Sequence, residues 1–417
     1  MSATLSIETL KKENLIGLGP RLINGPAPSG VLKENPEDFV VQEIPSNLPR
    51  DDDGRYTIFS ATLRNWDTNR FVIALADHFR ISRERITYAG TKDKRGITTQ
   101  FFCIDGTYDP YTINYGDVTI SEVFRSNTKL ELGMLSGNRF SVNLFPKSSV
   151  SDLNSRKEMI DSFGGFPNYF GWQRFGSMRI NTHRIGELLV RGRYEEAVVL
   201  YLYDPIFDSE DFRKNFGETR DAKMALKEYP SHLRFERSLL GYIVEHNRIE
   251  GAFDVFPRYL KMIFIHSFQS YIFNRMLTKR IEKLGSLNRT FPGDTVTEVD
   301  SLFNRVGDPF VVNSFSVEKI QRGIDENRMR PQMKLFGHDS EFSTGLMGDI
   351  EKDSLGDIKL SDFRIRGHRD MWSSGDFRVV SAIPSNFSVA DDLKLNFDLG
   401  KGMYATIFLR ELVDFPW

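Results

Sequence analysis

The chain has 417 residues, more than a single hydrophobic core usually supports, so two domains are expected. Hydrophobic residues make up 40% of the chain and aromatic residues 12%, which suits well-filled cores. The net charge of −2 excludes a global basic excess, so a nucleic-acid partner would have to bind a local basic surface.

Cysteine and histidine content limits the chemistry. Cys103 is the only cysteine, which excludes a disulfide framework and a thiolate metal cluster and indicates a reducing compartment. The seven histidines lack the paired spacing of zinc ligands, and no metal is expected. The N-terminus shows no apolar signal region, and no apolar run reaches membrane-spanning length, so a cytoplasmic protein is expected.

Helix and strand patterns alternate in the first part of the chain. Residues 68–79 have helical apolar spacing, with Asp67 or Thr68 as the N-cap. Residues 97–104 are rich in Ile, Thr and Phe, and residues 139–145 alternate apolar and polar side chains, so both are predicted strands. A loop is predicted between the helix and the first of these strands.

That loop belongs to the most informative stretch of the chain, Tyr88–Gln100 (YAGTKDKRGITTQ). Asp93 stands between Lys92 and Lys94, and adjacent ammonium groups favour the charged form of a carboxylate. An ionised aspartate in a positive field can act on a polyanion as nucleophile or base. A bare Lys-Asp-Lys triplet is far more often a solvated turn, so the interpretation depends on the longer stretch.

The middle of the chain is expected to be largely helical. Two helical segments lie within residues 185–203, and a long apolar-faced helix is predicted over 258–280. Residues 285–367 mix Asp, Ser, Gly and Asn with short apolar runs, and no structure is predicted for them. A strand over 393–397 and a short helix over 404–412 end the chain.

Basic residues gather between Asn168 and Arg193. This stretch holds five arginines and one acid, Glu187, whereas residues 204–221 are acid-rich. A polarised surface of this kind can bind RNA on one side, although an ordinary solvated face explains the cluster equally well.

Six motifs resemble those of the TruD family of pseudouridine synthases and follow one another in the same order as in that family. The stretch around Asp93 resembles the family's catalytic signature. Because order and spacing agree over most of the chain, the set is far more specific than any one motif. The other motifs are Leu32–Val41, Lys129–Gly133 with Gly137–Phe140, Pro167–Gly176, Gln269–Asn274 and Tyr404–Glu411.

The resemblance implies an α+β fold with a discontinuous catalytic domain on a mixed, largely antiparallel sheet. Residues 1–166 and 371–417 would form this domain, and residues 167–370 would form an inserted, mostly helical TRUD domain. A folded RNA would lie in the cleft between the two domains.

The resemblance also implies a tRNA pseudouridine synthase, with the uridine at tRNA position 13 as its target. The reaction detaches uracil, rotates it and rejoins it through C5 without redox change, so no cofactor is expected. Asp93 would be the catalytic residue, and attack at C1′, attack at C6 and removal of a ribose proton all remain open. The expected partner is tRNA, with no membrane and no obligate protein partner, and a monomer is expected.

Further residues are expected at the substrate. Phe140 would stack on the extruded uracil, and Asn138, on the same strand face, would hydrogen-bond the base or hold the Asp93 loop. Lys33 would neutralise phosphate or steady Asp93, and Phe39 would pack beneath the site. Without the resemblance, the two phenylalanines read as core residues and Lys33 as a solvated side chain.

Arg174, Arg179 and Arg184 are expected to contact RNA phosphates, which position an RNA without reading its sequence. The motif that contains Arg174 has a purely architectural alternative.

Two other classes of protein fit parts of the sequence. A noncatalytic RNA-binding protein on the same scaffold would not need Asp93 together with Asn138 and Phe140. A phosphate-transfer enzyme is disfavoured, because the chain lacks GxxxxGK[ST] and the segment after Gly90 leads into a strand rather than a helix.

Overall fold

Eight strands drawn from both ends of the chain form one mixed sheet. Its strands are β1 (Phe39–Pro45), β2 (Tyr56–Arg64), β3 (Ile86–Tyr88), β4 (Ile97–Asp105), β5 (Val118–Ser126), β6 (Leu135–Asn143), β13 (Ser385–Val389) and β14 (Lys394–Gly400). Their order is β13-β14-β6-β1-β4-β2-β5, with β3 paired to β4. β1 and β4 are parallel, and the other pairs are antiparallel. The expected α+β class and the three predicted strands are confirmed.

This computed structural model describes residues 12–23, 27–28, 35–92, 96–144, 149–176 and 178–414. Two predicted site residues, Asp93 and Lys33, lie outside the described residues.

Helix α2 (Thr68–Phe79) covers one face of strands β2 to β4. Its N-cap is Asp67, so the predicted helix and one of its two predicted caps are confirmed. Phe71 in this helix packs edge-on against Phe102 in β4, with 4.8 Å between ring centroids, and both rings are fully buried. This apolar contact fixes the start of α2, and with it Thr68, above the sheet.

Helices make up much of the middle of the chain. They are α3 (Val150–Ser162), α4 (Thr182–Val190), α5 (Tyr194–Leu202), α6 (Asp211–Thr219), α7 (Ala222–Glu228), α8 (Arg234–His246), α9 (Arg258–Leu284), α10 (Val317–Asp325), α11 (Gly345–Leu355) and, near the C-terminus, α12 (Ala405–Leu412). The helices predicted within 185–203 and over 258–280 and 404–412 are confirmed. Across the described residues, none of the helices is long and apolar enough to cross a membrane.

A second, four-stranded sheet has three of its strands in the region for which the sequence predicts no structure. Its strands are β8 (Thr295–Val299), β9 (Arg305–Val311), β10 (Met329–Phe336) and β11 (Gly375–Val379). They pair antiparallel in the order β11-β10-β8-β9. The insertion that was expected to be mostly helical therefore also contains a sheet.

The two ends of the chain meet at α12. Arg410 in this helix donates to both carboxylate oxygens of Glu13 at 2.8 Å and to Glu411 at 2.8 Å, and all three side chains are buried. Burial alone would lower the pKa of Arg410, but the hydrogen bonds and charges of the two carboxylates outweigh burial and raise it. The short pair of β7 (Phe166–Pro167) and β12 (Ser381–Ala382) links the segment after α3 to the segment before β13.

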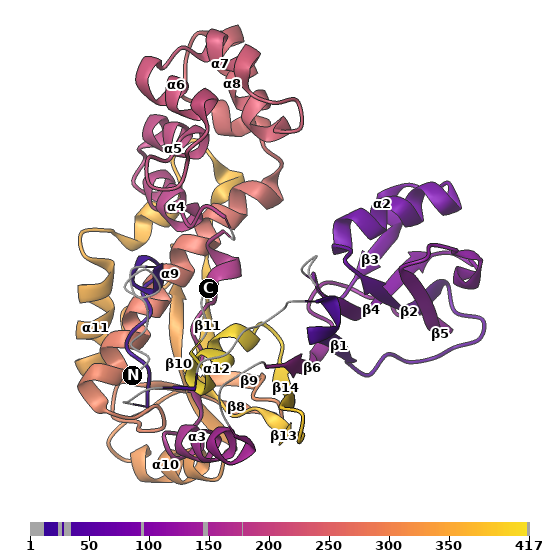
Figure 1. Ribbon diagram of the computed structural model, residues 1–417. Helices are drawn as coiled ribbons and strands as arrows, with labels where there is room; N and C mark the ends of the chain where they lie inside the picture. Colours follow the sequence, from indigo (N-terminus) through magenta and orange to yellow (C-terminus); the bar gives the residue numbers. More distant parts are fainter. Residues whose placement is uncertain are drawn as a thin grey trace.

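Figure 1 shows β1 to β5 and α2 on one side of the molecule, and α9 with the second sheet on the other. Strands β6 and β14 lie between these two parts. The division into residues 1–166, 167–370 and 371–417 stays a proposal. Within the last of these ranges, β13 and β14 belong to the eight-stranded sheet, whereas β11 pairs with β10 of the second sheet.

Candidate active site

The face of the large sheet that α2 covers carries polar side chains where β4, β1 and β6 run side by side. Across these strands, Asn138 pairs with Glu43, and Phe140 pairs with Val41, which also pairs with Thr98. Directly paired residues project to the same side of a sheet. Asn138 and Phe140 therefore share one face, as the alternation predicts, and they share it with a buried carboxylate.

A buried ion pair holds the signature loop (residues 89–96) to this face. Lys92 Nζ lies 2.7 Å from Glu43 Oε1, and the side chains are 10% and 1% exposed. Glu43 Oε2 also accepts the Phe101 N–H at 2.9 Å. Burial raises the pKa of Glu43, and the charge and hydrogen bond of Lys92 oppose that rise. Our sequence reasoning missed Glu43, although an acid at an inward position of an alternating strand is a detectable signal.

A hydrogen-bonded relay fixes the backbone at the same point. The Lys92 N–H donates to Thr68 Oγ1 at 2.9 Å, and this hydroxyl donates to Gln100 Oε1 at 3.1 Å. Thr68 is the first residue of α2, and Gln100 lies in β4. The loop is therefore tied to a helix and a strand that the hydrophobic core already holds in place.

The far end of the signature loop is held as well. Gly96 O accepts the Asn65 N–H at 3.0 Å. The φ of Gly96 is +126°, and a Cβ there would come within 2.5 Å of Phe39 O. Only glycine allows this approach, so the strand that begins at Ile97 enters the sheet directly beside Phe39.

The loop does not follow the predicted helix directly. Residues 86–88 form β3, which pairs antiparallel with residues 102–104 of β4. The loop therefore joins two neighbouring strands, not a helix and a strand. Three residues are too few for strand periodicity to show in the sequence.

Three buried polar atoms on this face have no hydrogen-bond partner among the described residues. They are Asn138 Oδ1, Thr98 Oγ1 and Gln100 Nε2. Buried polar groups in proteins are almost always paired, so a cluster of three exceptions needs an explanation. The face can offer both a donor and acceptors to a group that binds there.

Aromatic rings border the polar face. The Phe140 ring stacks on Phe397 of β14, with centroids 5.2 Å apart and an angle of 18° between the planes. Phe39 meets Phe140 edge-on at 6.1 Å. All three rings are buried, so Phe140 belongs to the core as well as to the site. Its stacking on a base stays a prediction.

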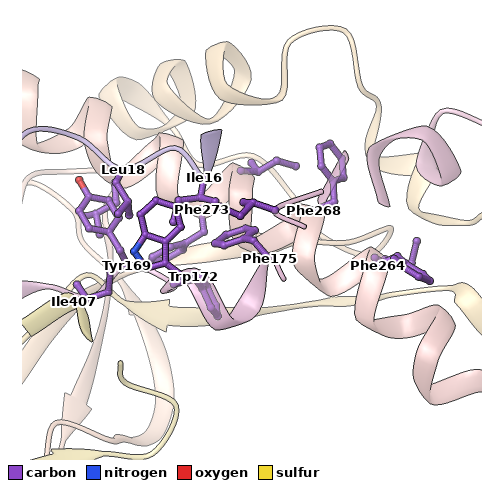
Figure 2. Close-up of a cluster of buried hydrophobic side chains, with 14 of the residues drawn as sticks. Ile16, Leu18, Tyr169, Trp172, Phe175, Phe264, Phe268, Phe273 and Ile407 are labelled. Carbon is purple, nitrogen blue, oxygen red and sulfur yellow. The ribbon is translucent and has the colours of Figure 1, made fainter. Parts of the chain in front are cut away.

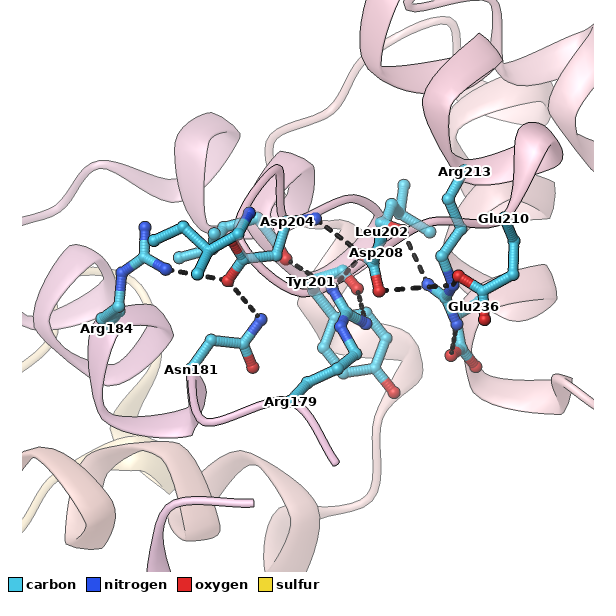
Figure 3. Close-up of polar contacts among 12 residues, drawn as sticks. Arg179, Asn181, Arg184, Tyr201, Leu202, Asp204, Asp208, Glu210, Arg213 and Glu236 are labelled. Carbon is cyan, nitrogen blue, oxygen red and sulfur yellow. Dashed lines mark hydrogen bonds and ion pairs between the residues drawn. The ribbon is translucent and has the colours of Figure 1, made fainter. Parts of the chain in front are cut away.

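Two of the three predicted phosphate-binding arginines lie in an internal polar network (Figure 3). Arg184 Nη1 lies 2.8 Å from Asp204 Oδ2, and Arg179 Nη2 lies 3.0 Å from Asp208 Oδ2. Arg179 also donates to the backbone oxygen of Tyr201. These pairs join α4 and the segment before it to the segment between α5 and α6. Both arginines therefore have structural partners, and their phosphate contacts stay a prediction.

Arg174 and its motif join several elements. Asn168 Nδ2 donates to Val379 O at 3.0 Å, and the Phe170 N–H donates to Asn274 Oδ1 of α9 at 2.9 Å. Arg174 Nε donates to the Ser270 hydroxyl at 3.0 Å, and burial lowers the pKa of this guanidinium. Figure 2 shows the aromatic side chains of this motif packed into the core beside α9. These contacts support the architectural reading of the motif.

Metal ligands do not gather anywhere in the part of the chain that the structure describes. No group of three or more His, Cys, Asp or Glu side chains is placed to hold an ion there.

A family model and several relatives match this chain over most of its length. The family model described as tRNA pseudouridine synthase D (TruD) matches residues 16–412. A Picrophilus torridus relative described as a probable tRNA pseudouridine synthase D is 45% identical, over 92% of this chain and 94% of its own. A Thermoplasma acidophilum relative with the same description is 46% identical over the same shares.

A solved structure has the same fold. The crystal structure of a Methanosarcina mazei protein described as a putative tRNA pseudouridine synthase D (TruD) superposes with a TM-score of 0.78 and 32% identity. The alignment covers 96% of this chain and 97% of the other. The fold and the relatives thus define an isomerase of the pseudouridine synthase class. Within that class, the chain belongs to the TruD family.

Proposed function

We propose that the protein converts uridine to pseudouridine in tRNA, at position 13, with Asp93 as the catalytic nucleophile or base. The observation that carries this proposal is that both flanks of residues 93–95 are fixed over one polar sheet face. Lys92 is held by Glu43 and Thr68, and Gly96 lies against Phe39. Asp93 follows directly in the chain after Lys92, which is fixed beside this face.

The residues on that face suit an extruded base. Asn138 has a buried amide oxygen without a partner, and an amide can both donate to and accept from uracil. The Phe140 ring offers an apolar surface on which stacking repays part of the cost of unstacking the base. We retain Phe39 as the support beneath Phe140 and Lys33 as a phosphate contact or partner of Asp93. The isomerisation is redox-neutral, so no cofactor enters the proposal.

Binding of tRNA requires contacts beyond the reacting base. Arg174, Arg179 and Arg184 remain proposed phosphate contacts, in addition to the internal bonds that they make. We propose a cytoplasmic protein that acts as a monomer and needs no other protein.

The first test is tritium release from tRNA labelled at C5 of uridine. The parent protein is expected to release tritium, and Asp93→Asn is expected to release none while still binding tRNA. Asp77→Asn serves as the matched control, because Asp77 is an exposed aspartate of α2 in the same part of the molecule. Mapping of the product then tests position 13.

The result also decides between two classes of protein. Tight tRNA binding by the parent without any release would favour a noncatalytic RNA-binding protein. Equal release by the parent and by Asp93→Asn would remove Asp93 from the reaction and leave the family assignment in place.

A further inference from the structure

A cavity of about 490 Å³ opens between the second sheet and the turn after β14, beyond the polar face described above. The volume is in the range of pockets that hold small organic groups. Apolar and polar side chains line it together, which is typical of sites that bind a planar, hydrogen-bonding group. Among the lining side chains are Phe303, Phe377, Met403, Gln332, Arg378 and Lys401.

The cavity lies close to the candidate active site along β14. Leu399 pairs with Asn138, and Lys401, which lines the cavity, follows two residues later. Two residues of chain span at most about 7 Å, so the cavity begins within reach of an adjacent nucleotide. Asn304 fixes this arrangement, because it accepts the Lys401 N–H at 2.9 Å and donates to Ser136 O at 2.7 Å.

One buried acceptor in the cavity wall has no partner. Gln332 is 3% exposed, and its Oε1 makes no hydrogen bond within the described part of the chain. The residue lies in β10, paired with Thr295 on one side and Val379 on the other, so its backbone is fixed. Because Gln332 also lines the cavity, an N–H of a ligand bound there would satisfy this acceptor.

Two cations at the cavity suit an anion. Arg378 is held by Asn168, to whose backbone and side-chain oxygens it donates at 2.8 and 2.6 Å. Burial lowers the pKa of Arg378 to about 10, so it stays charged at neutral pH. Lys401 is exposed and donates only weakly, to a backbone oxygen at 3.3 Å. Two carboxylates also line the cavity: Asp376 is paired with Arg305 at 2.8 Å, and Asp308 offsets one of the two cations, so the lining keeps a net positive charge.

We propose that this cavity binds the base of a nucleotide adjacent to the target uridine, with Gln332 as the residue that recognises the base. Arg378 and Lys401 then face the phosphate of the same nucleotide. The proposal rests on the proposed function, because it takes the RNA to be the substrate already bound at Asn138. It assigns part of the sequence preference to a sheet that lies outside the candidate active site.

The test compares binding of unmodified tRNA with tRNAs in which each neighbour of the target uridine is replaced in turn. The parent is expected to prefer one base at one neighbouring position by about tenfold. Gln332→Met, which keeps the size but removes the acceptor, is expected to weaken binding of the preferred tRNA about threefold to tenfold and to abolish the preference. Thr295→Val is the matched control, because Thr295 is the cross-strand neighbour of Gln332 and does not line this cavity.

A second variant covers the case in which Gln332→Met does not fold. Lys401→Gln changes an exposed side chain and is expected to reduce the salt dependence of tRNA binding by about one phosphate contact. An unchanged salt dependence would contradict the proposal, as would equal weakening of all tRNAs by Gln332→Met.

Turnover measured on the same samples separates the cavity proposal from the proposed isomerisation. A parent that isomerises uridine without any preference for neighbouring bases overturns the cavity proposal alone. Base-selective binding through Gln332 without turnover overturns the proposed isomerisation alone.

Discussion

At the scale of single residues, the buried pair of Glu43 and Lys92 places the signature loop. We expect Lys92→Ala to lower the free energy of unfolding by about 3–5 kcal/mol at pH 8, because it leaves the Glu43 carboxylate buried without its partner. Denaturant unfolding of the parent and the variant measures this difference.

The stability lost in Lys92→Ala should depend on pH. Burial raises the pKa of Glu43 in the folded protein, and removal of Lys92 raises it further. The folded variant therefore binds a proton more readily than the unfolded chain, and the lost stability returns as the pH falls below that raised pKa. Destabilisation should be smaller at pH 5 than at pH 8. A double variant that also carries Glu43→Gln should lose this difference, and equal values for Lys92→Ala at both pH values would contradict the assignment.

Phe140 combines a packing contact with a proposed substrate contact, and kinetics can separate the two. Stacking of a base on an aromatic ring contributes about 1–3 kcal/mol, so Phe140→Leu should lower kcat/KM roughly tenfold to a hundredfold. Phe397→Leu removes the other ring of the same stacked pair and serves as the control. We expect the two variants to lose similar stability, and we expect Phe140→Leu to lose more kcat/KM than Phe397→Leu. Equal losses of kcat/KM would show that Phe140 acts through packing alone.

At the scale of elements, the first turn of α2 has a second task beyond covering the sheet. Thr68→Val keeps the shape of the side chain but leaves the Lys92 N–H and Gln100 Oε1 without their shared partner. We expect a loss of about 1–3 kcal/mol and faster hydrogen exchange at the Lys92 amide. Thr68→Ser restores the hydroxyl and should restore slow exchange. Unchanged exchange in Thr68→Val would mean that the relay does not hold the loop.

The elements differ in how far their sequences reveal them. Helix α2 and strand β4 could be predicted, because their apolar spacing follows the period of the element that they form. Strand β9 could not, since every residue from Arg305 to Val311 is exposed and no burial pattern exists to be read. Strands β8 and β10 of the same sheet depend on a pairing between distant segments, which local patterns do not contain.

The residues of the candidate site also differ in how far the sequence reveals them. Asn138 and Phe140 could be found from a motif and its alternation. Glu43 had a signal in the sequence, an acid at an inward position of an alternating strand. Thr68 and Gln100 became visible as site residues only through the fold that brings α2 and β4 together. An arginine-rich stretch, in turn, does not show whether its charges face a ligand or an internal carboxylate. Arg184, which the structure pairs with Asp204, illustrates this limit.

At the scale of the whole molecule, the two sheets must keep a fixed relation for one RNA to reach both the polar face and the cavity. Asn304 provides a direct link, because it precedes β9 of the second sheet and bonds to Ser136 and Lys401 of the large sheet's margin. We expect Asn304→Ala to lower kcat/KM for tRNA about tenfold with a stability loss of about 1–3 kcal/mol.

Hydrogen exchange locates the cause of that loss. The Lys401 amide should exchange faster in Asn304→Ala, because its acceptor is gone, while the Lys92 amide, held by Thr68, should keep its rate. Faster exchange at both amides would indicate general unfolding. Faster exchange at Lys401 with unchanged kcat/KM would show that the reaction tolerates a loose connection between the sheets, because the polar face alone would then position the uridine.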